Sequence, residues 1–102
     1  MEEYQDQIVE AIRLRKKLRL NYKGEGYRIV CPHILYFSDV GNKLLDAYQI
    51  SGYSKHQNEI PGWKPFYLAE ITDLDMLEDT FEIAPGYNPS NRSRYLTIVA
   101  KI

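Results

Sequence analysis

The sequence contains few of the residues that covalent and metal chemistry require. Cys31 is the single cysteine and there are two histidines, so a disulfide within the chain is excluded and no metal-ligand spacing is present. No apolar run reaches the length of a membrane span, and an N-terminal apolar leader segment is missing. The net charge of −1 argues against tight, unspecific nucleic-acid binding, which needs a strongly basic domain. We therefore expect a cytoplasmic protein with no metal, no cofactor and no membrane partner.

Combinations of residues that perform catalysis are also missing. Cys31 and His33 would project to the same side of a strand, but no third residue is placed to orient them as a nucleophile and base. The acidic residues between 70 and 82 lack the alternation and the central glycine of a calcium loop, which favours a solvated face. We therefore expect a protein that is not an enzyme and has no catalytic residues.

The sequence is rich in tyrosine, and its charged residues are unevenly distributed along the chain. Nine tyrosines stand against three phenylalanines and one tryptophan. A tyrosine ring with its polar tip suits contact sites, although β-rich domains favour tyrosine as well. Residues 13–28 contain seven lysines and arginines and one acid, whereas residues 70–82 contain six acids and no lysine or arginine. The basic stretch can attract anions, or it can complement the dipole at the end of a helix.

The spacing of apolar residues predicts one helix followed by short strands. Residues 5–19 show helical spacing at Ile8, Ala11 and Ile12, with Asp6 as the expected N-cap. Alternating segments on either side of a two-glycine turn predict a β-hairpin. The expected strands cover residues 18–22, 27–31, 33–37, 43–50, 63–68 and 94–102. Residues 69–77 are compatible with either a helical turn or an irregular strand.

This element order predicts a single α+β domain over residues 1–102. One helix and several short strands with tight turns are typical of a small barrel or a strongly bent sheet. The barrel strands are expected over about residues 18–71, and a C-terminal extension over residues 84–102. Residues 51–62 form the longest unpatterned stretch, and loops of this length are often functional or disordered.

Six segments follow one another in an order known from a protein family. They are IVEAI (residues 8–12), LNY (20–22), RIVCPHIL (28–35), LDAY (45–48), WKPFYLAEI (63–71) and FE (81–82). This order resembles the WYL domain. The resemblance implies an N-terminal helix followed by an Sm-like or SH3-like β-barrel of about five strands. It also implies a sensing role in bacterial transcription regulation, with single-stranded DNA or another nucleic acid as the ligand in several cases. WYL domains usually follow a winged-helix DNA-binding domain, which we expect here on another protein.

The sequence departs from the WYL pattern at positions that would bind phosphate. The tripeptide that names the family falls on residues 43–45, where only its leucine remains. Lys64 replaces one arginine of the family pattern, and Glu70 occupies the position of a second. The loss of one positive charge and the gain of one negative charge weaken the phosphate site that the resemblance would imply. The positions that match are Arg28, Pro32, His33 and Tyr48.

A ligand site is predicted from cations and rings at the matching segments. A planar guanidinium suits phosphate or carboxylate, a lysine supplies a point charge, and aromatic rings allow stacking on a base. The candidates are Arg28, His33, Tyr48, Trp63 and Lys64. Structural alternatives stand beside them: an arginine paired with the acids of residues 70–82, a capped or solvated histidine, and a tryptophan packed at the barrel rim.

Two functions remain open at this point. The first is a ligand-sensing module that binds single-stranded nucleic acid, a nucleotide-like ligand or another anion, and it requires the five candidates to converge on one exposed surface. The second is a protein-interaction or homo-oligomerisation domain without a small-molecule ligand, docking on a regulator protein or a second copy. The tyrosines and the charge asymmetry would suit that role.

Overall fold

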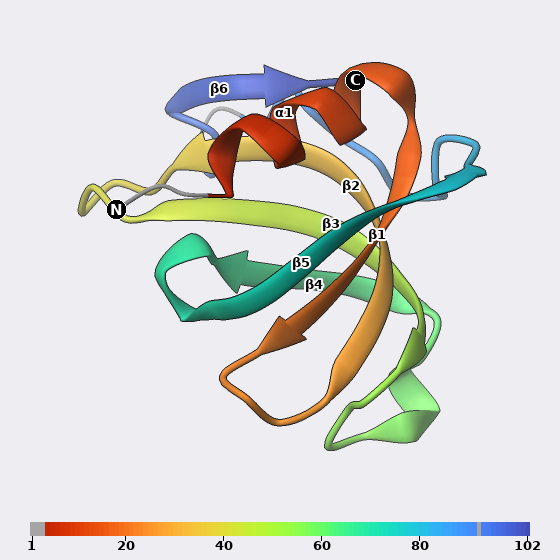
Figure 1. The fold of residues 1–102 in the computed structure, drawn as a ribbon. Coiled ribbons are helices and arrows are strands. Elements are labelled where there is room, and N and C mark those ends of the chain that lie inside the picture. Colours follow the sequence, from red (N-terminus) through yellow and green to blue (C-terminus); the bar gives the residue numbers. More distant parts are fainter. Residues whose placement is uncertain (1–3, 92) are drawn as a thin grey trace.

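A six-stranded antiparallel sheet and one N-terminal helix make up the computed structural model, which describes residues 4–91 and 93–102 (Figure 1). The elements are α1 (Gln5–Leu14), β1 (Lys16–Tyr22), β2 (Tyr27–Phe37), β3 (Lys43–Gly52), β4 (Gly62–Tyr67), β5 (Ile71–Thr80) and β6 (Thr97–Lys101). Two 3₁₀ turns, η1 (Gln57–Glu59) and η2 (Leu68–Glu70), precede and follow β4. The predicted α+β class is confirmed.

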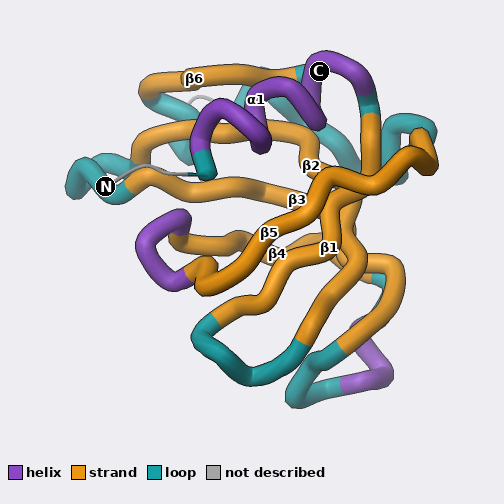
Figure 2. Tube along the Cα trace, in the orientation of Figure 1, coloured by secondary structure: helices purple, strands orange, loops and turns teal. Residues whose placement is uncertain are grey.

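The sheet is a strongly bent meander. Its strand order is β4-β3-β2-β1-β5, and β6 pairs with β2 outside this path. β1 pairs with both β2 and β5. Within residues 4–91 and 93–102 no ladder joins β4 to β5, so the sheet is not closed into the predicted barrel. Figure 2 shows α1 and β6 lying together at one end of the molecule, with the β1–β2 turn at the other end.

One apolar core fills the space between α1 and the concave face of the sheet. Ile8, Ala11 and Ile12 share one face of the helix, and all three are buried. They belong to the same core cluster as Leu20 of β1 and Phe66 of β4. Side chains alternate between the two faces of a strand. We call the face that carries Leu20 and Phe66 the inner face and the opposite one the outer face.

The helix is shorter than the sequence predicts. It ends at Leu14 rather than at residue 19, because Arg15 adopts the left-handed conformation (φ 54°) and the chain enters β1 at Lys16. The N-cap is Tyr4 without a side-chain hydrogen bond, and Asp6 lies inside the first turn. Leu18, which also fits helical spacing, is a ladder residue of β1. The pairing of β1 with two neighbouring strands therefore outweighs the local helix signal.

β2 is one long strand where the sequence predicts two. It runs from Tyr27 to Phe37 through Pro32. The ladder with β3 has an irregularity between Pro32 and Ile34, and proline in a sheet is tolerated at such irregularities because it has no N–H to donate. The undecided residues 69–77 belong to the end of η2 and to β5. The C-terminal extension contains the strand expected over residues 94–102, which is shorter in the structure and forms β6 (Thr97–Lys101).

Candidate functional site

The five predicted ligand residues lie on two different faces of the sheet. Trp63 and Lys64 are consecutive in β4, and consecutive side chains of a strand point to opposite faces. Lys64 lines a cavity together with Arg28. Trp63 instead contacts Tyr48 and His33 on the outer face. The single surface that the sequence predicts is therefore not formed.

Aromatic rings pack tightly on the outer face. His33 is fully buried, and its ring centroid lies 4.7 Å from Trp63 and 5.1 Å from both Phe81 and Tyr87. Trp63 also meets the ring of Tyr48 edge-on at 5.5 Å. Because the rings pack on one another, the geometry favours the packing role of Trp63 over a platform for a stacked base.

Hydrogen bonds attach the segment after β5 to these rings. The indole N–H of Trp63 donates to the carbonyl oxygen of Pro85 at 2.7 Å. The backbone N–H of Ala84 donates to Nε2 of His33 at 3.0 Å, while Nδ1 of His33 lies 2.7 Å from the carbonyl oxygen of Cys31. The proton of a neutral imidazole is thereby assigned to Nδ1. Burial lowers the pKa of His33 below its ordinary 6.5, which is consistent with a structural role.

Arg28 and Lys64 line a cavity of about 270 Å³ between the β1–β2 turn and the segment that connects β3 to β4. Lys23 from the turn and Lys55 from the connecting segment bring two more cations to its wall. The remaining lining residues are Tyr22, Glu25, Ser54 and His56. Four lysines and arginines against one lining carboxylate make this wall positively charged.

Arg28 is buried with few hydrogen-bond partners. Its side chain is 10% exposed, and its Nη2 lies 3.6 Å from Oε1 of Glu25. Nη1 donates to Oε1 of Gln49 at 3.4 Å, and Nε has no hydrogen-bond partner in the described part of the chain. Charge-assisted hydrogen bonds are typically about 2.7–2.9 Å long, and a guanidinium has five N–H donors. Most of the donor capacity of Arg28 is therefore unused.

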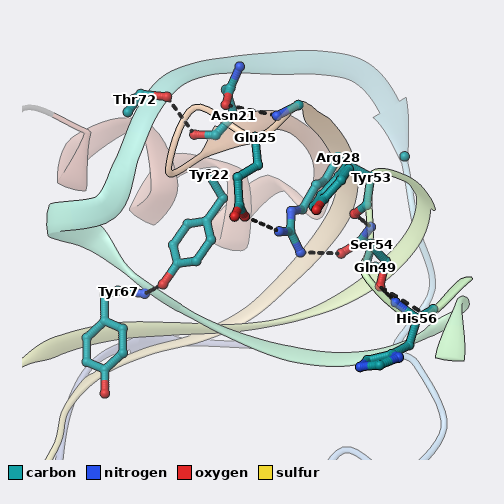
Figure 3. A network of polar contacts seen from close by, with 12 residues as sticks. Asn21, Tyr22, Glu25, Arg28, Gln49, Tyr53, Ser54, His56, Tyr67 and Thr72 are labelled. Atoms are coloured by element: carbon teal, nitrogen blue, oxygen red, sulfur yellow. Dashed lines mark hydrogen bonds and ion pairs between the residues drawn. The ribbon is translucent and has the colours of Figure 1, made fainter.

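Aromatic rings and a buried amide hold the Arg28 guanidinium in place (Figure 3). Its central carbon lies 5.3 Å from the ring centroid of Tyr53 and 5.5 Å from those of Tyr22 and Phe66. Gln49, which is fully buried, donates from Nε2 to the carbonyl oxygen of Tyr53 at 2.9 Å. The rings attract the positive charge, but they supply no oxygen acceptor for the N–H donors that Gln49 and Glu25 leave unused.

Lys64 already has a carboxylate partner. Its Nζ lies 2.9 Å from Oε1 of Glu59 in η1, and the Glu59 side chain is 54% exposed. The hydrogen bond and charge of Lys64 lower the pKa of Glu59. Each of the two predicted cations in the cavity thus faces one carboxylate from a turn.

Three basic residues of this cavity are absent from the site predicted from the sequence. Lys23, Lys55 and His56 lie in a turn and in a connecting segment, whose position relative to Arg28 cannot be derived from sequence spacing. The one sequence feature that points to them is the unpatterned stretch of residues 51–62, which contains Lys55 and His56.

A second polar centre lies on the outer face around the buried Asp46. Its carboxylate accepts hydrogen bonds from the hydroxyl of Tyr36 (2.8 Å), the hydroxyl of Tyr95 (2.6 Å), and Nε and Nη2 of Arg94 (2.9 and 3.0 Å). Burial and the bond to Asp46 raise the pKa of Tyr95 to about 12. Four donors occupy the roughly four acceptor positions of a carboxylate, so this centre anchors the C-terminal extension.

The basic and acidic stretches of the sequence lie next to each other on β1 and β5. Arg19 pairs with Asp75 at 2.5 Å and Lys16 with Glu78 at 3.4 Å. The acidic partner of Arg28, by contrast, comes from its own turn rather than from residues 70–82. These cross-strand pairs reduce the charge separation on which a docking role would depend.

Comparison with known proteins identifies no relative, since neither a family model nor a curated protein sequence matches the chain. Over residues 4–91 and 93–102, no helix has the length and apolar character needed to cross a membrane. The same residues contain no group of three or more histidine, cysteine or acidic side chains arranged to hold a metal ion.

Proposed function

We propose that the protein is a non-enzymatic binding module that takes an anionic ligand in the cavity around Arg28. The observation that carries this proposal is a guanidinium that is 10% exposed, lines a cavity and has one hydrogen bond and one long ion pair. A buried charge without adequate partners costs several kcal/mol in order of magnitude, and oxygens of a bound anion would supply the missing acceptors. Lys23, Lys55 and Lys64 add attraction for the same ligand.

The size of the cavity limits what it can enclose. Its volume of about 270 Å³ is near the lower end of typical small-molecule pockets, which begin at roughly 300 Å³. A nucleotide-like molecule or the end of a single nucleic-acid strand could therefore place its anionic group inside. The rest of such a ligand would extend along the lysines at the rim.

The resemblance to the WYL domain fits this proposal. An N-terminal helix precedes a meander in which β1 pairs with both β2 and β5. One further ladder between β4 and β5 would complete a five-stranded barrel, which supports an Sm-like or SH3-like assignment. A ligand-sensing role in bacterial transcription regulation would follow from that assignment. The proposed ligand site keeps Arg28 and Lys64 of the five predicted residues and leaves out His33, Tyr48 and Trp63.

Binding at low salt tests the proposal directly. A short oligothymidylate and a nucleoside monophosphate are titrated while backbone amide resonances are recorded. We expect shifts concentrated in the β1–β2 turn, in residues 53–56 and at Lys64, with affinity falling as salt rises. Lys55→Glu should weaken binding, whereas Lys101→Glu makes the same charge change on β6 and should not. The absence of binding by both ligands at low salt would contradict the proposal.

A protein-interaction or homo-oligomerisation role is the second candidate, favoured by exposed sheet edges. β4 pairs only with β3 and β5 only with β1 among the described strands, so each leaves one edge unpaired. Such edges can pair with another chain. Tyr67 on β4 and Met76 on β5 are exposed large side chains at these edges. Light scattering over a concentration series tests this role, because a strictly monomeric mass would contradict self-association.

A further inference from the structure

The carboxylate that faces Arg28 belongs to a turn rather than to the sheet. Glu25 lies between Gly24 (φ +69°) and Gly26 (φ +138°) in the β1–β2 connection. Its backbone N–H donates to the carbonyl oxygen of Tyr22 at 3.0 Å, which fixes the turn through the backbone. The Glu25 side chain is 36% exposed. It can therefore leave Arg28 by rotating about its own bonds, without a change in the sheet.

The ion pair between Glu25 and Arg28 is weak. The 3.6 Å separation is longer than the about 2.7–2.9 Å of a charge-assisted hydrogen bond. Glu59, the partner of Lys64, is more than half exposed. Partly exposed pairs of this kind typically contribute little to stability. Two carboxylates thus neutralise part of the positive charge of the cavity in the free protein, and a more highly charged ligand can replace Glu25 at Arg28.

We infer that the cavity selects a phosphate monoester, which displaces Glu25 from Arg28. A carboxylate ligand would exchange one single negative charge for another and gain little. A phosphate monoester carries a charge of about −1.5 to −2 at pH 7 and offers three strong acceptor oxygens. These oxygens can accept from the unused donors of Arg28 and, at the same time, from a lysine of the cavity.

The charge of a phosphate group differs between the interior and the phosphorylated end of a nucleic-acid strand. A phosphodiester in the backbone has a single charge, whereas a terminal phosphate is a monoester. The cavity therefore prefers the phosphorylated end of a single strand, or a nucleoside monophosphate, to the strand interior. This inference rests on the proposed anion-binding function and adds the chemical class of the ligand.

Calorimetric titration of the full chain tests the selectivity. The ligands are acetate, inorganic phosphate, a nucleoside 5′-monophosphate, and an oligothymidylate with or without a 5′-phosphate. We expect the 5′-phosphate to improve oligonucleotide binding about tenfold. Inorganic phosphate and the monophosphate separate recognition of the free anion from recognition of a nucleotide. Acetate should bind more weakly than inorganic phosphate.

A charge-removing variant tests the displacement of Glu25. Glu25→Gln keeps the size of the side chain and removes the competing charge, so it should bind the 5′-monophosphate several-fold more tightly. Glu82→Gln makes the same change on an exposed acid that does not line the cavity and should leave the affinity unchanged. Circular dichroism verifies that each variant is folded.

The possible failures are distinguishable. If the 5′-phosphate brings no gain, or if Glu25→Gln binds no more tightly than the wild type, the phosphate-monoester inference is overturned while anion binding itself stands. Weaker binding by Glu25→Gln would show that this carboxylate contacts the ligand favourably, which also overturns the displacement. If the wild type and Glu25→Gln both fail to bind every anion at low salt, the proposed function fails as well.

Discussion

His33 in β2 accepts a hydrogen bond from the backbone N–H of Ala84, a residue 51 positions later in the chain. The acceptor is Nε2 of a fully buried ring, so the bond exists only while the imidazole is neutral. The indole N–H of Trp63 in β4 donates a second hydrogen bond to the same segment, at the carbonyl oxygen of Pro85. The beginning of the C-terminal extension is therefore attached to the sheet through a group that can be protonated.

We expect the protein to lose stability as the pH falls below about 6.5. Burial lowers the pKa of His33 in the folded state below the 6.5 of an exposed histidine. Near that pH the unfolded chain takes up a proton that the folded chain does not. The contribution of neutral His33 to the free energy of unfolding is therefore complete above pH 6.5. It decreases as the pH falls from 6.5 toward the pKa of His33 in the folded state. Urea unfolding at several pH values between about 5 and 7.5 measures this decrease.

His56 provides the control for this pH dependence, because it is exposed and is the only other histidine in the chain. The decrease should persist in His56→Asn, where His33 is the only imidazole left. The ring resonances of His33 should also keep their neutral positions as the pH passes below 6.5. A pH dependence that disappears in His56→Asn would contradict the assignment to His33.

Trp63→Phe should destabilise the fold by about 1 kcal/mol or somewhat more. The variant keeps an aromatic ring but loses the N–H that donates to the carbonyl oxygen of Pro85. Tyr48→Phe is the matched control, because it keeps the ring that meets Trp63 edge-on and removes only a hydroxyl. Urea unfolding followed by circular dichroism compares the two. Equal losses in both variants would contradict a specific role for the indole N–H.

The sequence predicts a strand correctly where alternation and turn residues alone determine its position. Period-two alternation and glycine turns located β1, β3 and β4 to within a few residues. The end of the helix was missed because Leu18 fits both helical and strand spacing, and only its pairing with Val30 across the sheet decides between them. The sequence indicates a break at Pro32, because it does not reveal the ladder irregularity that accommodates this proline within β2.

For the candidate site, too, the sequence predicts what depends on neighbouring residues and misses what depends on the order of the strands. Alternation alone separates Trp63 from Lys64, since consecutive strand residues face opposite sides. Which of the two shares a cavity with Arg28 depends on the order of β2, β3 and β4 in the sheet. Lys23 of the β1–β2 turn and Lys55 of the segment between β3 and β4 join Arg28 through long-range geometry, which no sequence period encodes.

Asp46→Asn should destabilise the protein more than Tyr95→Phe does. Asp46 accepts four hydrogen bonds, two of them from Arg94, and an asparagine offers one acceptor oxygen and places an NH₂ group against donors. Hydrogen bonds to charged groups contribute about 1.5–3 kcal/mol, so we expect a loss of about 2–3 kcal/mol. Tyr95→Phe removes one of the four donors to the same carboxylate and should cost about 1.5 kcal/mol, the lower end of this range. Urea unfolding measures both, and equal losses would contradict a central role for Asp46.

Gly52→Ala should damage both stability and ligand binding, because Gly52 lies against the backbone that carries Arg28. Gly52 has a φ of +101°, and a Cβ added there would come within 2.6 Å of the Cα of Arg28. Alanine must therefore move β2 at the base of the cavity, and we expect a loss of about 3 kcal/mol.

Gly41→Ala separates this close approach from the effect of backbone conformation alone. Gly41 also has a positive φ, +87°, but an added Cβ would meet no atom within 4 Å. Its replacement should cost about 1 kcal/mol and leave ligand affinity unchanged. Urea unfolding and calorimetric titration compare the two variants. If Gly52→Ala lost no more stability than Gly41→Ala and bound the ligand as well as the wild type does, the position of Arg28 would not depend on this contact between β2 and β3.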